Sequence, residues 1–278
     1  MNKFDEIYKS IIKDIMENGI EELNVRTNLK TKSLPGVNFS IDIEKDGFPV
    51  LTLRKQPLKS PIAEQIWFLQ GERDTEFLRK YTKIWDKFLE DNGTLDTAYG
   101  YRWRKYFGRD QLYEAVKLLK SEPSSRQAVV VTWDPASDGL NDEYTKKNVP
   151  CPFTFTLNII GGRLHLHNIV RSNDMILGCP FDVFGFALLQ CILADYLGVK
   201  PGIYTHSISN AHIYENHYSA AKELIKRECY HGKIDLRLPE NTLYRALLKD
   251  ENIVDEIYAD INLQYYPQDA IKNLEIAI

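Results

Sequence analysis

The chain of 278 residues is 44% hydrophobic and 27% charged, which is ordinary for a soluble globular protein. Its net charge of −4 argues against a nucleic-acid polymer as the main partner, because polymer binding usually shows as a basic surplus. The four cysteines form no CxxC pair, so we expect neither a metal site nor a disulfide framework. The N-terminus has no apolar signal core, and no apolar run is long enough to span a bilayer, so we expect no membrane partner. Together these features predict a cytosolic protein with reduced thiols.

The first elements follow from hydrophobic periodicity. Residues 3–17 carry apolar side chains at helical spacing before Gly19, which predicts an amphipathic helix. Residues 36–54 alternate around Asp46 and Gly47, which predicts two strands joined by a turn. Arg26 lies between these elements on a predicted loop.

The middle of the chain is richer in helices and aromatic residues. Pro61 is typical of the first turn of a helix, which Gly71 ends, and Glu64 falls within its apolar face. An aromatic-rich, irregular stretch follows. The further elements predicted here are helices over 75–81 and 111–120, a β-rich run over 127–133 and a polar loop over 134–148.

The second half begins with a predicted hairpin, in which 153–160 and 164–170 flank two glycines. Residues 184–197 are apolar nearly all round and predict a buried central helix, and 218–229 predict another helix. The sequence shows no internal repeat or convincing linker. We therefore expect one α+β domain over residues 1–278.

Cys151 is the candidate nucleophile. It stands on a Pro-X-Pro turn just before the predicted hairpin, whereas most lone cysteines are small buried hydrophobic residues. A thiolate attacks best when a neighbouring cation lowers its pKa, and Arg171 supplies one if strand pairing brings it close.

Arginines together with a serine form a candidate phosphate site. Any single arginine is most often a solvated surface charge, so only the combination is informative. Guanidinium groups suit bidentate contact with phosphate. The candidate residues are Arg26, Arg126, Arg171 and Ser172.

Other candidates concern protons and the sugar. If Glu64 is buried, desolvation raises its pKa and suits it to proton transfer through water. His212 and Tyr214 alternate on one face of an extended segment, where they suit a sugar hydroxyl. His165 and His167 also share a strand face, but a metal site would need a third ligand.

Taken together, the motifs resemble the thymidylate synthase family from about Arg26 to the C-terminus, in the order and nearly the spacing of that family. The matching motifs are Ala-Glu-Gln-Ile-Trp-Phe-Leu-Gln-Gly around Glu64, 84–86, Tyr99-Gly100, Trp103-Arg104, Ser125-Arg126, Pro150-Cys151, 171–174, 177–181 and 212–217.

The resemblance implies a large, mostly antiparallel sheet flanked by helices, in a homodimer whose sheets pack face to face. It implies that Arg126 reaches the partner's phosphate site, and that 5,10-methylenetetrahydrofolate is the co-substrate. Cys151 would attack C6 of a pyrimidine nucleotide monophosphate, and Glu64 would organise proton transfer. Trp85, Asp174 and Ile278 would bind the folate.

The chain departs from the family's usual pattern at Asp182, where thymidylate synthases carry asparagine. A carboxylate accepts from the N4 amino group of cytosine and shares a proton with N3, but it faces O4 of uracil without a donor. Attack at C6 raises the basicity of N3, so Asp182 also stabilises the adduct. Aspartate here is similar to the branch that hydroxymethylates CMP or dCMP. Further departures are Phe88, Gln127, Pro152 and Val170.

The leading hypothesis is therefore 5-hydroxymethylation of a cytidine monophosphate, with water adding to the exocyclic methylene group. The main alternative is ordinary thymidylate synthase activity, which methylates dUMP to dTMP. A third is a nucleotide-binding protein that keeps the fold without catalysis, against which the presence of both Cys151 and Glu64 argues.

Overall fold

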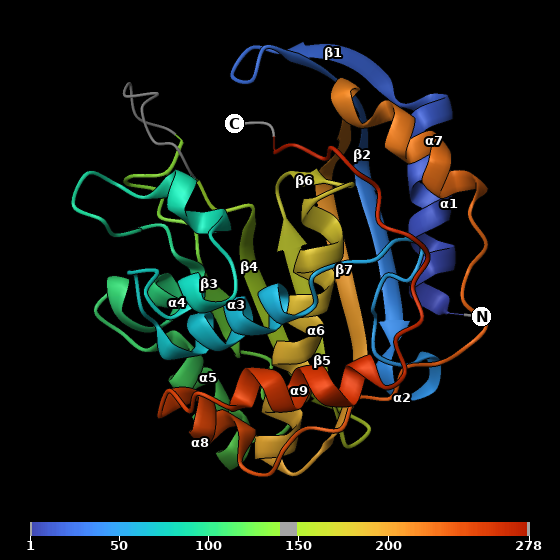
Figure 1. The fold of residues 1–278 in the computed structure, drawn as a ribbon. Coiled ribbons are helices and arrows are strands. Elements are labelled where there is room, and N and C mark those ends of the chain that lie inside the picture. Colours follow the sequence, from blue (N-terminus) through green and yellow to red (C-terminus); the bar gives the residue numbers. More distant parts are fainter. Residues whose placement is uncertain (1, 140–148, 277–278) are drawn as a thin grey trace.

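The computed structural model describes residues 2–139 and 149–276. Within that part of the chain, seven strands form one mixed sheet in the order β1-β2-β7-β5-β4-β3, with the short β6 beside β7 (Figure 1). All neighbouring strands are antiparallel except the β5–β7 and β6–β7 pairs. The strands are β1 (Ile20–Asn24), β2 (Leu29–Asp42), β3 (Val129–Val131), β4 (Pro152–Ile160), β5 (Arg163–Val170), β6 (Asn173–Asp174) and β7 (Lys200–Tyr214).

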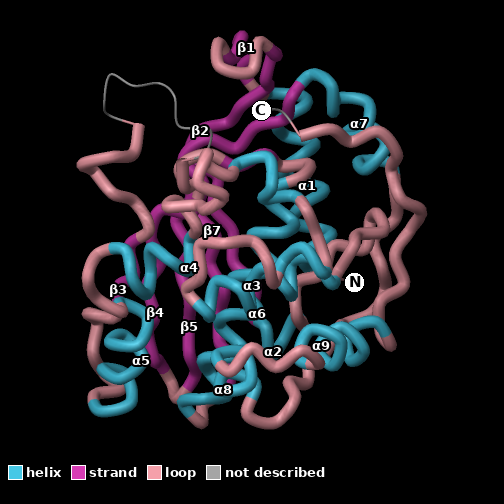
Figure 2. Tube along the Cα trace, turned by 60° about the vertical axis from the view of Figure 1, so that its left-hand side comes forward, coloured by secondary structure: helices cyan, strands magenta, loops and turns pink. Residues whose placement is uncertain are grey.

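The helices pack against this sheet, so the expected α+β architecture is confirmed (Figure 2). The α-helices are α1 (Lys3–Asn18), α2 (Ile43–Asp46), α3 (Lys59–Gln70), α4 (Tyr99–Tyr101), α5 (Gln111–Ser121), α6 (Gly178–Leu197), α7 (Tyr218–Lys226), α8 (Thr242–Leu247) and α9 (Ile253–Asn262). Shorter turns are η1 (Leu78–Lys80), η2 (Ile84–Phe88), the π-helical η3 (Arg102–Tyr106) and η4 (Glu215–His217).

The centre of the fold is α6, which packs against β5, β7 and α3. It begins at Gly178, earlier than predicted, and ends as predicted at Gly198, whose φ of 69° suits glycine. The length and hydropathy of α6 are also those of a membrane-spanning helix, which the sequence analysis did not expect. However, 72% of its most apolar stretch is buried inside the fold. Such burial is typical of a core helix.

Of the two strands predicted over residues 36–54, the structure contains only the first. The first strand exists, but α2 replaces the turn and residues 50–53 are buried without forming a strand. Their backbone is satisfied by side chains from the N-terminus: Asn2 donates to the Val50 carbonyl at 2.8 Å, and Asp5 accepts from the Thr52 N–H at 2.9 Å. These long-range bonds replace a strand ladder.

The other predicted helices and strands are confirmed with different ends, apart from the helix over 75–81, which is reduced to η1. The predicted loop over 134–148 lies outside the described residues from position 140 onward. The Thr75 hydroxyl bonds to Asp86 at 3.1 Å, and the Trp67 indole donates to the Asp74 carbonyl at 2.8 Å. These side-chain contacts hold the segment in an irregular path. The long strand β7 was expected only in its last residues.

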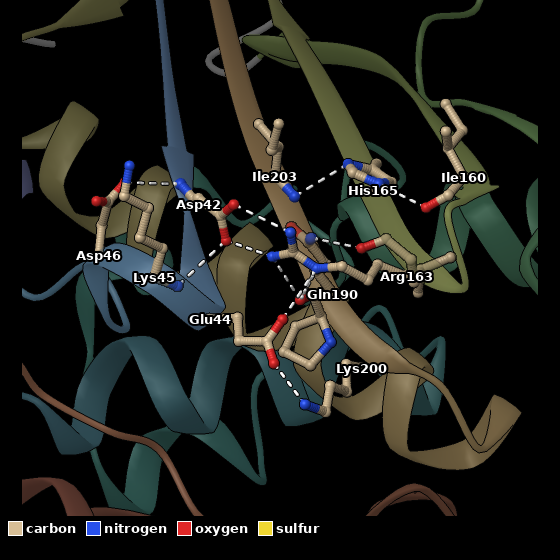
Figure 3. Close-up of polar contacts among 12 residues, drawn as sticks. Asp42, Glu44, Lys45, Asp46, Ile160, Arg163, His165, Gln190, Lys200 and Ile203 are labelled. Carbon is tan, nitrogen blue, oxygen red and sulfur yellow. Dashed lines mark hydrogen bonds and ion pairs between the residues drawn. The ribbon is translucent and has the colours of Figure 1, made fainter.

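One face of the sheet carries the partly exposed side chains of β3, β5 and β7, among them Val131, His165 and Ile203. Figure 3 shows that the His165 ring accepts from the Ile203 N–H at 3.0 Å and lies 3.2 Å from the Ile160 carbonyl. His167 bonds to Ser207 at 2.7 Å. Both histidines thus have protein partners, and residues 2–139 and 149–276 contain no cluster suited to a metal ion.

Candidate active site

Strand pairing places Cys151 beside Arg171. Cys151 precedes β4 and Arg171 follows β5, and the Arg171 N–H donates to the Cys151 carbonyl at 2.9 Å. The Arg171 guanidinium then reaches back, donating to the Pro150 carbonyl at 2.8 Å and the Val149 carbonyl at 2.9 Å. Its Nη2 lies 3.7 Å from the Cys151 sulfur. The expected cation therefore lies next to the thiol.

The Cys151 thiol is held in an environment with both signs of charge. Burial raises its pKa, Arg171 and Arg26 lower it, and Asp182 and Asp174 raise it. The net pKa lies above the ordinary value, so the resting group is mainly a thiol. Proton removal therefore has to accompany nucleophilic attack.

Glu64 lies in the middle of α3, where it accepts a hydrogen bond from the indole N–H of Trp85. Trp85 packs against Trp67 and Tyr99, with ring centroids 5.6 Å away in each case. Burial raises the pKa of Glu64 to about 7, the Trp85 bond lowers it, and the charge of Asp182 raises it further. This is the shift in pKa expected for a carboxyl group removed from water, and it suits proton transfer near neutral pH.

Asp182 lies near the start of α6 and accepts from the Asn173 amide at 2.7 Å. Burial raises its pKa to about 7, the Asn173 bond opposes the shift, and Asp174 adds to it. Because α3 and α6 pack together, Asp182 and Glu64 are close enough to influence each other. The site thus holds two carboxyl groups that both change protonation near pH 7.

His212 and Tyr214 end β7 on the same side, as predicted, with ring centroids 4.9 Å apart at 88°. Burial lowers the pKa of His212, and Asp174 raises it. Arg26 is exposed in the β1–β2 turn, where it lowers the pKa of Tyr214 against the effect of burial. Arg26, His212 and Tyr214 therefore lie in the same region of the structure as the Cys151 turn.

Among the residues that it describes, the structure gives no contact that ties the three remaining candidates to this cluster. Ser172 is half-buried in the turn between Arg171 and β6, without a bond to a described side chain. Arg126 is exposed between α5 and β3 and pairs with none of the residues that the structure describes. Ile278 lies outside the described residues.

Sequence analysis gave no role to three residues that the structure places in the site. Burial raises the pKa of Tyr99, which receives a backbone hydrogen bond from Cys151. Its position depends on Gly100, where a Cβ would lie 2.0 Å from the Phe68 carbonyl oxygen. Trp133 lies 5.7 Å from the Arg171 guanidinium, and Asn173 bonds to Asp182. Only Tyr99 and Asn173 carried a signal, as members of the quoted motifs.

All the described residues of the candidate site lie within a part of the chain that one protein-family model matches. The model of the thymidylate synthase family matches residues 6–278, which is nearly the whole chain.

Proposed function

Because this chain belongs to the thymidylate synthase family, we propose that it transfers a one-carbon unit to cytosine, as a 5-hydroxymethylase of CMP or dCMP. Family membership itself makes the chain a folate-dependent pyrimidine nucleotide one-carbon transferase. The observation that carries the choice of cytosine is the carboxyl group of Asp182, enclosed beside Glu64 with a pKa raised by burial to about 7.

The protonation of Asp182 suits cytosine. A carboxyl group with one proton donates to the bare N3 of cytosine through one oxygen and accepts from the N4 amino group through the other. When the sulfur of Cys151 adds to C6, N3 becomes more basic, and the proton of Asp182 then stabilises the adduct. An ionised Asp182 would meet O4 of uracil without a donor, which costs affinity.

Cys151 and Glu64 supply the remaining protein chemistry. The thiol of Cys151 loses its proton and forms a bond to C6, which makes C5 nucleophilic. When bound, methylenetetrahydrofolate would supply the one-carbon unit at C5. Glu64 accepts the C5 proton through water as the bond between the methylene carbon and the folate nitrogen breaks, so that tetrahydrofolate leaves and an exocyclic methylene remains on C5. Water then adds to that methylene, and the C6–sulfur bond breaks to release Cys151. No hydride moves, so the folate is not oxidised.

The residues near Glu64 fit a folate. Trp85 and Phe88 form an aromatic wall with centroids 6.0 Å apart, next to the carboxyl group of Glu64. We assign folate contacts to Trp85 and Asp174, and to Ile278 from the resemblance alone. Asp174 is half-buried and accepts from the N–H groups of Ile176 and Leu177, which fixes its carboxylate at the start of α6.

Nucleotide binding is assigned to the residues around the Cys151 turn. Arg26, Arg171 and Ser172 would hold the phosphate, and His212 and Tyr214 the sugar. The exposed Arg126 has no described partner in its own subunit, which supports a role in a neighbouring one. The proposal therefore includes a homodimer joined through the partly exposed sheet face. It also includes a cytosolic location, which the four free cysteines favour.

A side-by-side assay tests the function. The protein is given methylenetetrahydrofolate with CMP, dCMP or dUMP, each tritiated at C5, and both tritium release and dihydrofolate absorbance are followed. We expect release from CMP or dCMP without dihydrofolate, and no release in Cys151→Ala. Turnover of dUMP alone, with dihydrofolate formed, would establish the thymidylate synthase alternative. Nucleotide binding without tritium release would indicate a non-catalytic protein.

Asp182→Asn provides the matched variant, because the amide has the same shape as the carboxyl group. We expect it to shift preference toward dUMP by about tenfold or more, since an amide complements both N3–H and O4 of uracil. An unchanged preference would mean that another residue discriminates between the bases.

A further inference from the structure

A row of buried polar side chains lies directly behind Asp182. The Asn173 amide nitrogen donates to Asp182 Oδ2 at 2.7 Å, and the Asn173 Oδ1 lies 3.0 Å from His206 Nε2. The other ring nitrogen, His206 Nδ1, lies 2.7 Å from the Tyr204 hydroxyl. Asn173 is 2% exposed, and Tyr204 and His206 are fully buried. The row therefore connects Asp182 to β7 without contact with solvent.

The direction of these hydrogen bonds is fixed by Asp182. An ionised carboxylate only accepts, so Asn173 must present its N–H group, and its oxygen must then accept from His206 Nε2–H. His206 is left with Nδ1 as an acceptor, which the Tyr204 hydroxyl satisfies. This requires a neutral imidazole with one donor and one acceptor, and burial lowers the pKa of His206 to about 3, so the ring is neutral at ordinary pH.

The row makes the two oxygens of Asp182 unequal. Oδ2 accepts from the Asn173 N–H, and a protonated oxygen is a poorer acceptor than a carbonyl-like one. When Asp182 takes up a proton, the proton therefore belongs on Oδ1, and Oδ2 stays the acceptor.

We propose that Tyr204, His206 and Asn173 are positioning residues that keep Asp182 protonated on Oδ1 and accepting on Oδ2, and so select cytosine over uracil. The inference rests on the proposed function. With cytosine, Oδ1–H donates to N3, and Oδ2 has a second lone pair for the N4 amino group. The donor on Oδ1 and the acceptor on Oδ2 are thus in place before the nucleotide binds.

Uracil would demand the reverse pattern, with Oδ1 accepting from N3–H and Oδ2–H donating to O4. The single proton on Oδ2 would then go to O4, so the Asn173 N–H could donate only to a hydroxyl oxygen, which is a poorer acceptor than a carbonyl-like one. Turning the Asn173 amide would not relieve this, because its oxygen would face Oδ2 without a proton between them and its NH2 group would face the Nε2–H of His206. Either arrangement leaves a buried polar group poorly paired, which costs free energy.

Equilibrium binding without folate tests this idea. Affinities for CMP and UMP are measured by calorimetry in the wild type and in Tyr204→Phe, which removes one hydroxyl that touches no substrate. We expect the CMP-to-UMP preference to fall about tenfold, on the scale of one buried hydrogen bond. Affinity for ribose 5-phosphate should stay the same, because that ligand lacks the base.

Tyr8→Phe is the control, because Tyr8 is equally buried and its hydroxyl bonds to the Met175 carbonyl at 2.8 Å outside this row. It should keep the wild-type preference. A Tyr204→Phe protein that also keeps the preference would overturn the role of the row while leaving the proposed function intact. A wild type that binds UMP more tightly than CMP would overturn both.

The wild type alone offers a second test that does not depend on variants folding. In protein labelled with ¹⁵N-histidine, NMR distinguishes the two neutral tautomers of a buried imidazole. We expect His206 to carry its proton on Nε2, with or without CMP. A proton on Nδ1 would reverse the row and contradict the proposal.

Discussion

The Nη2 atom of Arg171 donates to the Val149 carbonyl at 2.9 Å and also lies 3.7 Å from the sulfur of Cys151. One guanidinium thus holds the backbone of the nucleophile's turn and sets the electrostatic environment of the thiol. The reactivity of Cys151 should therefore depend on Arg171 before any nucleotide binds.

Replacing Arg171 by glutamine removes the charge that most strongly opposes the raised pKa of Cys151. We expect that pKa to rise further, so that the thiolate fraction at pH 7.5 falls, by roughly tenfold for the loss of one adjacent charge. The rate of Cys151 alkylation by iodoacetamide, followed by mass spectrometry, measures this fraction. Arg163→Gln is the control, because Arg163 starts β5, the strand that Arg171 follows, and pairs with Asp42 instead (Figure 3). Equal rates in all three proteins would contradict the assignment.

Cys151→Ser tests the covalent step. A hydroxyl is scarcely ionised at neutral pH, so turnover should fall by roughly a thousandfold or more, while nucleotide affinity by calorimetry stays within about threefold. Cys229→Ser, which changes a half-buried cysteine near α7, should retain full turnover. A Cys151→Ser enzyme with near-normal rates would exclude attack by this sulfur.

Asp182 should lower the stability of the protein at high pH. Burial raises its folded pKa from 3.8 to about 7, so the folded state holds the proton more tightly than the unfolded state. The stability contributed by this proton is complete below about pH 4 and is lost as pH rises through about 7. Asp182→Asn should therefore stabilise the protein at pH 8, by on the order of 3 kcal/mol, and much less at pH 4. Urea unfolding at both pH values gives the comparison, and an equal effect at both would argue against a buried ionised group.

Trp85→Phe tests the link between Trp85 and Glu64. The indole N–H lowers the pKa of Glu64, so its loss should raise that pKa above about 7. If ionised Glu64 accepts the C5 proton, the acid limb of the kcat profile should move to higher pH by roughly one unit. Trp67→Phe is the matched control, because Trp67 packs beside Trp85 but donates to the Asp74 carbonyl. An unmoved limb in Trp85→Phe would show that another group titrates.

The sequence predicted those parts of the fold that follow from local patterns. The helix of residues 3–18 repeats its apolar residues, and the β4–β5 hairpin turns at two glycines with φ of 60° and 71°. The prediction from sequence failed where side chains distant in the chain determine the backbone conformation. Val50 and Thr52 are an example, because their backbone groups bond to the side chains of Asn2 and Asp5. The expectation of a single domain stays a prediction.

The candidate site was predicted in the same uneven way. Motifs identified Cys151 and Glu64, and strand pairing brought Arg171 to the thiol as expected. His206 was missed because β7 carries Pro201 and Gly202 near its start and mixes polar with apolar residues, which hides the strand pattern. Its role depends on contacts with other strands, which a single sequence does not reveal.

Asp182 lies in the early turns of α6, a helix that is mostly buried in the fold, so its backbone has little freedom to adjust. A single base change in the gene converts an aspartate codon into an asparagine codon, and the two side chains have the same shape. If Asp182 selects the base as proposed, one mutation at this position separates a preference for cytosine from a preference for uracil.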